Sequence, residues 1–183
     1  MKNIKIIKTG IDPKPLLEQI QPKHWKWVSQ QSGVGGKKNP YGFLPLTMAK
    51  VKQGENPKDT EGLGRTVLYS HFTEVHKFWK NWNIKETARA AFFKLQPDGR
   101  VGKHIDEGKY YLTKDRYHLS LQGRYHYTVG DEEMIVEPGT FFWFYNKVPH
   151  SAHNIGDNDR ITLVWDTPHN EGNPHHTIEE TEF

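Results

Sequence analysis

The sequence predicts a mainly β protein folded as a double-stranded β-helix (jelly roll), with flanking helices in its N-terminal half. Three observations favour this class. Short strand-type runs of five to eight residues follow one another from residue 89 onward. Turn-forming segments separate these runs about every ten residues, a spacing typical of antiparallel sandwiches and barrels. Helical spacing of apolar residues occurs only in the first half of the chain.

The N-terminal half begins with strand-type residues 4–8 and a short predicted helix at 15–21. The segment QQSGVGGKKNPYG, residues 30–42, lacks the Gly-Lys-Ser/Thr ending of a phosphate-binding loop, so we expect a flexible lid or connector. Residues 69–83 have aromatic and apolar side chains at helical spacing and predict a packing helix. His71 and His76 lie five residues apart on this helix, too far round it to share a metal ion.

The second half supplies the predicted barrel. Its strand-type segments are residues 89–96, 115–122, 123–129, 134–138, 139–145, 150–155 and 160–166. We therefore expect one domain over residues 1–183, with a helical and loop flank at 1–88, the double-stranded β-helix core at 89–167 and a C-terminal tail at 168–183.

Composition limits the classes of protein and of site. A chain of 183 residues can bury a hydrophobic core without stabilising disulfides or structural metals. It has no cysteine, so any metal must be held by His, Asp or Glu. The N-terminus is too rich in lysine for a signal-peptide core, and no later stretch is apolar enough to cross a membrane, so we expect a cytoplasmic protein. The net charge of +3 comes from interspersed charges, and we expect no nucleic-acid partner.

His104 and Asp106 are the first candidate metal ligands. They stand two residues apart in VGKHIDEG, residues 101–108, after strand-type residues 89–96 and the turn PDGR. Alternate side chains of an extended chain point to the same side, so both can reach one ion. The spacing alone is common in sequences; the position at the edge of the predicted barrel makes the pair a candidate.

A second set of polar residues lies in segment 115–122. Arg116, His118 and Ser120 share one face of the predicted strand, and the other face is apolar. One interpretation is an ordinary half-exposed strand with its polar side in water. The other is a polar face that lines the mouth of the barrel, where cationic and hydroxyl groups would bind a carboxylate.

His150 and Arg160 complete the candidate site. His150 follows the apolar segment 139–145, so the chain leaves a buried strand at a defined point. With His104 and Asp106 it forms the two-histidine, one-carboxylate set that holds Fe(II) on one side and leaves the other side open for a co-substrate and O2. Arginine binds carboxylates bidentately and is always charged, so Arg160 is a candidate partner for the far end of a dicarboxylate.

The order of these residues resembles the aspartyl/asparaginyl β-hydroxylase family of Fe(II)- and 2-oxoglutarate-dependent oxygenases. The similarity rests on a strand like RYHLSLQ, a later histidine, an arginine ten residues after it, and the closing apolar strand RITLVWD. It covers about residues 89–167. The resemblance implies a dioxygenase that hydroxylates an unactivated carbon of an amino acid or peptide residue, with succinate and CO2 as co-products.

Taken residue by residue, the resemblance implies His104 and His150 as iron ligands. It implies Arg160 as the partner of the distal carboxylate of 2-oxoglutarate. It places Arg116 and His118 near the co-substrate or the substrate.

Asp106 bears on the substrate. Animal members of the family that modify protein Asp and Asn lack the carboxylate ligand, so this chain is more similar to bacterial relatives that hydroxylate free amino acids such as proline. We therefore expect a small amino acid or a peptide residue as substrate. His153 faces away from His150 on an extended segment, and we expect it behind the ligands or outside the site.

Two alternatives stay open. The run PHSAHN also matches the His-x-x-x-Asn ending of a cupin motif, which predicts a cupin-type metalloenzyme of the same fold. A cupin usually has a His-x-His pair upstream, where this chain has Arg124 and His126. The second alternative is a metal-free jelly-roll binding module that uses exposed Trp and Tyr side chains.

Overall fold

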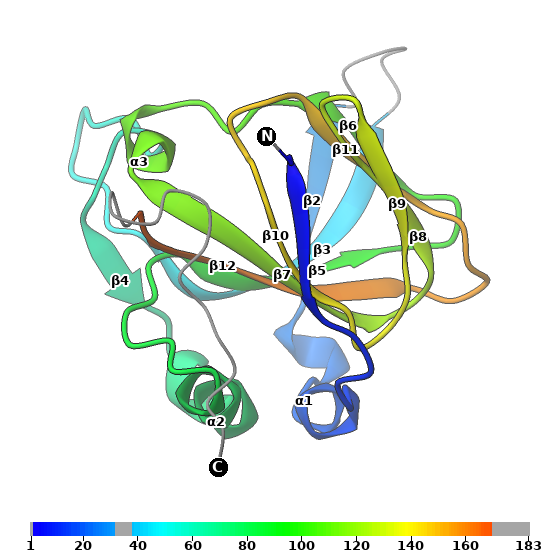
Figure 1. Cartoon of the computed structure of the whole chain (residues 1–183). Helices are drawn as coiled ribbons and strands as arrows, with labels where there is room; N and C mark the ends of the chain where they lie inside the picture. Colours follow the sequence, from blue (N-terminus) through cyan, green and yellow to red (C-terminus); the bar gives the residue numbers. More distant parts are fainter. Residues whose placement is uncertain (1, 32–37, 170–183) are drawn as a thin grey trace.

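Two antiparallel sheets face each other in the computed structural model, which describes residues 2–31 and 38–169 (Figure 1). The larger sheet contains, in spatial order, β1 (Ile4–Lys8), β10 (Phe141–Phe144), β7 (Lys114–Gln122), β12 (Arg160–Pro168), β5 (Ala90–Leu95), β3 (Lys38–Ala49) and β2 (Lys26–Gln31), with β4 (Leu63–Arg65) paired to β3. The smaller sheet contains β6 (Arg100–His104), β11 (His150–Asn154), β8 (Tyr125–Val129) and β9 (Glu132–Val136). The predicted double-stranded β-helix class is confirmed.

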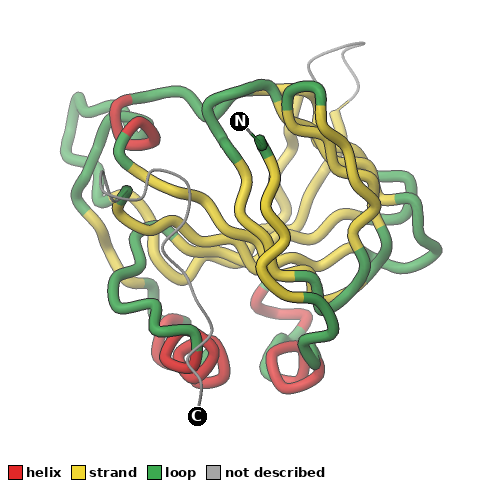
Figure 2. The backbone as a smooth tube through the Cα atoms, in the orientation of Figure 1, coloured by secondary structure: helices red, strands yellow, loops and turns green. Residues whose placement is uncertain are grey.

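Helices cover one face of the larger sheet. The described helical segments are α1 (Lys14–Glu18), α2 (Thr73–Asn81), α3 (Lys109–Leu112) and the 3-10 turns η1 (Pro22–His24) and η2 (Tyr69–His71). Figures 1 and 2 show α1 and α2 together beneath the larger sheet. The buried side chains of α2 are Val75, Phe78 and Trp79, and burial of each stabilises the fold by about 1.5–3 kcal/mol. The predicted packing helix is therefore present, in a shorter form.

Strand alternation separates the two faces of the larger sheet. The core cluster that packs against the helices contains Tyr117, Leu119 and Leu121 of β7. It also contains Leu163 and Trp165 of β12. Because side chains of a strand alternate, the residues between them point toward the smaller sheet. This alternation places both arginines of the predicted site on the face away from the helices.

The smaller sheet packs over that second face. Tyr125, Tyr127 and Val129 of β8 form a second core cluster with Phe142 and Phe144 of β10. The packing leaves a cavity between the sheets, lined by side chains from both of them. The fold thus builds a pocket with one wall on β7 and β12 and the other on β6, β8 and β11.

The first half of the chain departs from the expected flank. Besides β1 it contributes β2, β3 and β4 to the larger sheet, and the ends of the expected loop at 30–42 belong to β2 and β3. Gly and Pro made this segment resemble a loop because both are depleted in strands. The pairing of β3 with β5 overrides that preference, and the register of this pairing shifts between Pro45 and Thr47.

The second half and the tail also differ from expectation. α3 is a helix in the half where only strands were predicted. Its run of tyrosines favours strands, and four residues are too few to show helical periodicity. Most of the expected tail, residues 170–183, lies outside the described residues.

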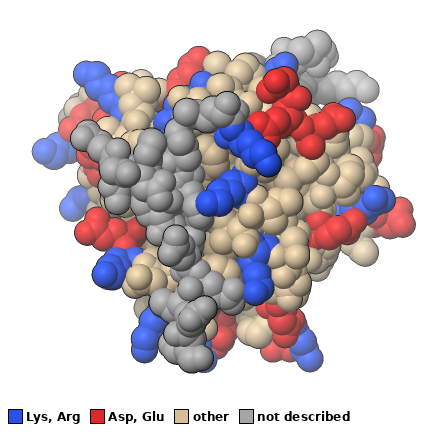
Figure 3. Space-filling view, in the orientation of Figure 1, with Lys and Arg blue, Asp and Glu red and all other residues tan. Residues whose placement is uncertain are grey.

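The described surface has mixed charge. On the face seen in Figure 3, Lys and Arg side chains lie interspersed with Asp and Glu. Among the helices of the described residues, none has the length and apolar character needed to traverse a bilayer.

Candidate active site

Three side chains that the sequence singled out meet at one end of the cavity. His104 ends β6, His150 begins β11, and the two residues are paired across the sheet. Asp106 follows β6 by two residues, and one ligand atom from each of the three side chains lies within 4.8 Å of the others. Asp106 Oδ1 is 3.9 Å from His104 Nε2, and Oδ2 is 3.9 Å from His150 Nε2.

Backbone hydrogen bonds orient both histidine rings. Nδ1 of His104 lies 2.8 Å from the carbonyl oxygen of Gly102, and Nδ1 of His150 lies 3.0 Å from that of Val148. In each ring Nδ1–H donates to the carbonyl, so the Nε2 lone pair is free and faces the cluster. This is the arrangement that metal-binding histidines commonly have.

Burial keeps His150 ready to act as a ligand. Its side chain is 4% exposed, whereas that of His104 is 38% exposed. Burial disfavours the imidazolium and lowers the pKa of His150 to about 4, even though the Asp106 carboxylate opposes this. A neutral imidazole at pH 7 offers its lone pair without first losing a proton. Two imidazole nitrogens and one carboxylate oxygen suit a first-row metal such as Fe(II).

Arg116 lies behind Asp106. Its Nη1 donates to Asp106 Oδ2 at 2.7 Å. Its Nε and Nη2 donate to the two carboxylate oxygens of Asp166, at 2.7 and 3.0 Å. Asp166 stands directly opposite Arg116 in the pairing of β12 with β7. The two carboxylates raise the pKa of Arg116, against the effect of its burial, so it stays charged.

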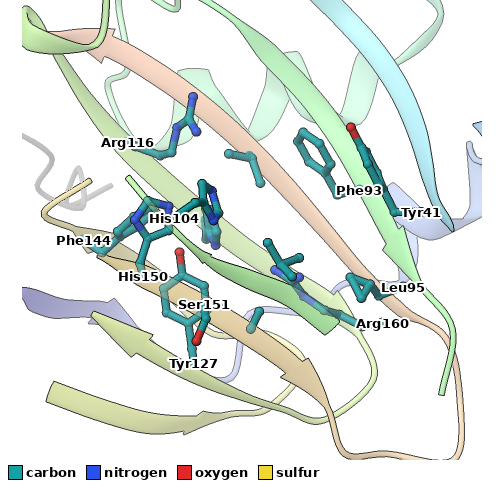
Figure 4. A pocket seen from close by; sticks show the side chains of 14 residues that line it. Tyr41, Phe93, Leu95, His104, Arg116, Tyr127, Phe144, His150, Ser151 and Arg160 are labelled. Atoms are coloured by element: carbon teal, nitrogen blue, oxygen red, sulfur yellow. The ribbon is translucent and has the colours of Figure 1, made fainter. Parts of the chain in front are cut away.

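The cavity extends from the cluster into the space between the sheets and encloses about 130 Å³. Figure 4 shows His104 and His150 at one end and Arg160 farther along the same pocket. Arg116 and His118 of β7 also line it, so the polar face of that strand does form a wall of the pocket.

Arg160 is a buried cation that has no counter-ion among the described residues. It is 4% exposed. Its Nε donates to Thr162 Oγ1 at 3.0 Å, and its guanidinium lies 4.1 Å from the centre of the Tyr125 ring. Among the described residues it has no carboxylate partner. A buried arginine without a counter-ion is costly, so its position on the cavity wall is suited to an anionic ligand.

His118 lines the cavity and carries a second unsatisfied polar group. Its ring is packed against Tyr127, Phe142 and Phe144, and its buried Nδ1 has no hydrogen-bond partner among the described residues. Burial and then the nearby charge of Arg160 lower the pKa of His118 well below its usual value. A neutral ring with an orphaned nitrogen is able to hydrogen-bond a ligand in the cavity.

His153 and His126 lie outside the cluster. His153 Nε2 is 2.6 Å from Asp98 Oδ1, and His126 Nε2 is 3.2 Å from Glu133 Oε2. Both histidines are thus occupied by acidic groups on the outer side of the smaller sheet. His150, rather than His153, is the histidine of this segment that reaches the candidate metal position.

Asn154 has a structural role, because its side chain hydrogen-bonds to the backbone. Its Nδ2 donates to the carbonyl oxygens of Leu95, Gln96 and Asn158 at 2.9–3.0 Å. These bonds secure the turn that precedes β12, and Asn154 does not line the cavity.

Asp166 and Asn146 were not predicted from the sequence. Asn146 Nδ2 donates to Asp106 Oδ2 at 3.3 Å. The signal for Asp166 was available, because it lies six residues after Arg160 on a strand and therefore on the same face. Asn146 lies in a turn, and its sequence neighbours carry no such signal.

Comparison with known proteins gives a family. The model of the aspartyl/asparaginyl beta-hydroxylase family matches residues 61–170, more than half of the chain. The chain belongs to this family. The predicted resemblance is thus confirmed, and the protein is an enzyme of the hydroxylase type.

A solved structure of similar architecture supports the fold of the hydroxylase. An oxidoreductase of the 2OG-Fe(II) oxygenase family from Burkholderia pseudomallei is similar at 13% identity with a TM-score of 0.58, covering 83% of this chain and 76% of its own. A predicted oxalate decarboxylase from Thermotoga maritima matches at 14% identity with a TM-score of 0.48, covering 81% and 97%. The first of these two likenesses supports the fold alone. No curated protein matches the chain.

Proposed function

We propose that the hydroxylase is an Fe(II)- and 2-oxoglutarate-dependent dioxygenase that hydroxylates an unactivated carbon of an amino acid or peptide residue. One observation carries this proposal. Arg160, a buried cation that lacks a carboxylate partner among the described residues, lines the same cavity as a cluster of two histidines and one aspartate.

In this proposal His104, Asp106 and His150 hold Fe(II). Two features support this assignment: the types of donor atom and the orientation of the two histidine rings. Both Nδ1 atoms hydrogen-bond to backbone carbonyls, and both Nε2 atoms face the cluster. Three protein ligands on one side leave positions open toward the cavity for co-substrate and O2.

2-Oxoglutarate fits the remaining polar groups. Arg160 would bind its distal carboxylate in a fork, as arginine does with planar anions. His118 Nδ1 would meet a polar atom of the co-substrate, and Arg116 on the same wall would lie near the end that faces the metal. The apolar walls of the cavity exclude water and strengthen these contacts.

When bound, Fe(II) and 2-oxoglutarate together supply oxidative decarboxylation by O2, which yields succinate and CO2 and the oxidant for the C–H bond. The protein's own contribution is binding and orientation. Arg160 fixes the far end of the co-substrate, and neutral His118 adds a hydrogen bond without a competing charge.

A neighbouring cavity suits an amino-acid substrate. It encloses about 250 Å³ and shares Phe93, Arg116 and Val164 with the first cavity. Its other walls combine apolar side chains of β3 and β5 with the charged groups of Arg89 and Asp166. Because the Asp166 carboxylate is already paired with Arg116, the group left for a substrate is the Arg89 guanidinium beside an apolar surface, which matches the carboxylate and aliphatic parts of an amino acid.

Substrate-dependent succinate release tests the function. The purified protein is incubated with Fe(II), 2-oxoglutarate and O2 against a panel of free amino acids and short peptides, with His150→Ala as the inactive control. We expect one class of amino acid or peptide to raise succinate release in the wild-type protein alone. Absence of both 2-oxoglutarate binding and turnover in the wild-type protein would refute the proposal.

A further inference from the structure

A buried chain of hydrogen bonds runs from Asp106 to β12. Asp106 Oδ2 accepts from Arg116, and Arg116 in turn is held by both carboxylate oxygens of Asp166. A bidentate pair fixes the plane of the guanidinium as well as its position. The direction of the third donor, Nη1, is therefore set by Asp166.

Asp166 itself is firmly held. Asp166 is 1% exposed, and its Oδ2 accepts a hydrogen bond from the Tyr110 hydroxyl at 3.0 Å. The Tyr110 oxygen in turn accepts from the backbone N–H of Arg89 at 3.0 Å, and Asp166 N–H donates to the Arg89 carbonyl at 2.9 Å. A carboxylate anchored this way on a central strand is a rigid support for a neighbouring site.

The contacts distinguish the two oxygens of Asp106. Oδ2 accepts from Arg116 Nη1 at 2.7 Å and from Asn146 Nδ2 at 3.3 Å. Oδ1 accepts no hydrogen bond from the described residues, and its near neighbour is His104 Nε2, 3.9 Å away. One oxygen is therefore held in place, and the other is available to a metal.

We propose that Asp166 is a positioning residue for the metal site: acting through Arg116, it fixes Asp106 so that Oδ1 alone is presented to the metal. The inference rests on the proposed function and deepens it. Without the Asp166 charge, Arg116 would keep Asp106 as its one carboxylate partner among the described residues and would be free to bind both oxygens of Asp106. The guanidinium would then compete with the metal for the ligand.

Binding of Mn(II) alone to the metal-free, full-length protein, followed by electron paramagnetic resonance, tests this without turnover. Asp166→Asn keeps the shape of the side chain and removes its charge, and we expect Mn(II) binding to weaken about 10- to 100-fold, the range for residues that support metal ligands. Arg116→Lys should weaken it similarly. Asp115→Asn is the matched control, because Asp115 is buried on the same sheet but pairs with Trp143 and His169; we expect less than about a threefold change.

A double-mutant cycle separates positioning from general damage. If Asp166 acts through Arg116, Asp166→Asn should have little further effect on Mn(II) binding in the Arg116→Lys background. At saturating metal, Asp166→Asn should lower 2-oxoglutarate affinity much less than Arg160→Lys does, since Arg160 is intact.

Several results would overturn the inference. The first is a folded Asp166→Asn protein that binds Mn(II) as tightly as the wild-type protein. The second is full additivity of the effects of Asp166→Asn and Arg116→Lys on Mn(II) binding. The third is a loss of Mn(II) affinity in Asp115→Asn as large as that in Asp166→Asn. If Asp166→Asn does not fold, Arg116→Lys decides the question, and wild-type affinity in that variant overturns it. No Mn(II) binding by the wild-type protein would instead refute the proposed metal site, and the inference with it.

Discussion

Two buried arginines line one cavity, and their surroundings differ. Arg116 is paired with Asp106 and Asp166. Arg160 has a hydroxyl and an aromatic face as neighbours and no carboxylate among the described residues. The protein thus neutralises Arg116 internally, and in the proposed function the distal carboxylate of 2-oxoglutarate would neutralise Arg160. Two residues of the same type would then have different tasks.

Substitution of Arg160 tests its task. Arg160→Lys keeps the charge and loses the bidentate fork, so 2-oxoglutarate binding should weaken about 10- to 150-fold, or roughly 1.5–3 kcal/mol. Calorimetric titration of the Mn(II)-loaded protein measures this. Arg124→Lys is the control, since Arg124 is more than half exposed and pairs with Glu137. Wild-type affinity in Arg160→Lys would remove Arg160 from the co-substrate site.

For single residues, the sequence predicted which side chains meet at the site better than it predicted which side chains pair with each other. The spacing of His104, Asp106 and His150, with strand alternation, was enough to expect that the three converge. The pairing of Arg116 with Asp166 depends on the register between β7 and β12. Register between strands distant in the chain is not visible in one sequence, so this contact was not predicted.

Among the elements, the segment after β6 carries Asp106 and ends at Gly108. Gly108 has φ of +117°, and a Cβ there would lie 2.2 Å from the Lys58 carbonyl oxygen. Only glycine allows this close approach. The glycine therefore sets where the Asp106 segment packs against the loop around residue 58.

Gly108→Ala tests the packing of this segment. The added methyl group must displace the backbone, so we expect the free energy of unfolding to fall by about 1–3 kcal/mol and Mn(II) binding to weaken. Gly54→Ala is the matched control: φ is +85° there, and a Cβ would have no neighbour within 4 Å. Urea denaturation measures both variants. Equal stability losses would show that the contact with Lys58 is unimportant.

Most strands of the second half were predictable because short strand-type runs are separated there by turn-forming segments, although β6 was not among the expected strands. The expected segments at 115–122 and 160–166 correspond closely to β7 and β12. β3 was missed because Gly and Pro dominate its local signal, while in the sheet it is paired with β5 on one side and with β2 on the other. Local patterns cannot report such a distant partner.

For the whole molecule, buried neutral histidines make stability depend on pH. The folded pKa of His150 is about 4, below its ordinary value of 6.5. Between these values the unfolded chain binds a proton that the folded chain does not, so stability falls as pH falls. Above pH 6.5 this contribution is fully present. The lowered pKa of His118 acts in the same direction.

The metal-free protein should therefore lose stability between pH 7 and pH 5. His150 should account for about 2 kcal/mol of the loss. Urea denaturation of wild-type and His150→Gln proteins at the two pH values isolates this contribution. The pH dependence should be smaller by that amount in the variant. An identical pH dependence in both proteins would show that His150 is not buried in its neutral form.

The iron and 2-oxoglutarate site is tested most directly by anaerobic titration of Fe(II) into the protein with 2-oxoglutarate present. The metal-to-ligand absorption band reports the ternary complex. We expect the band in the wild-type protein, its loss in His150→Ala, and its retention in His153→Ala, because His150 faces the cluster and His153 pairs with Asp98 on the other side. Loss of one of three protein ligands sharply weakens metal binding. A band that survives in His150→Ala and disappears in His153→Ala would contradict the proposed site.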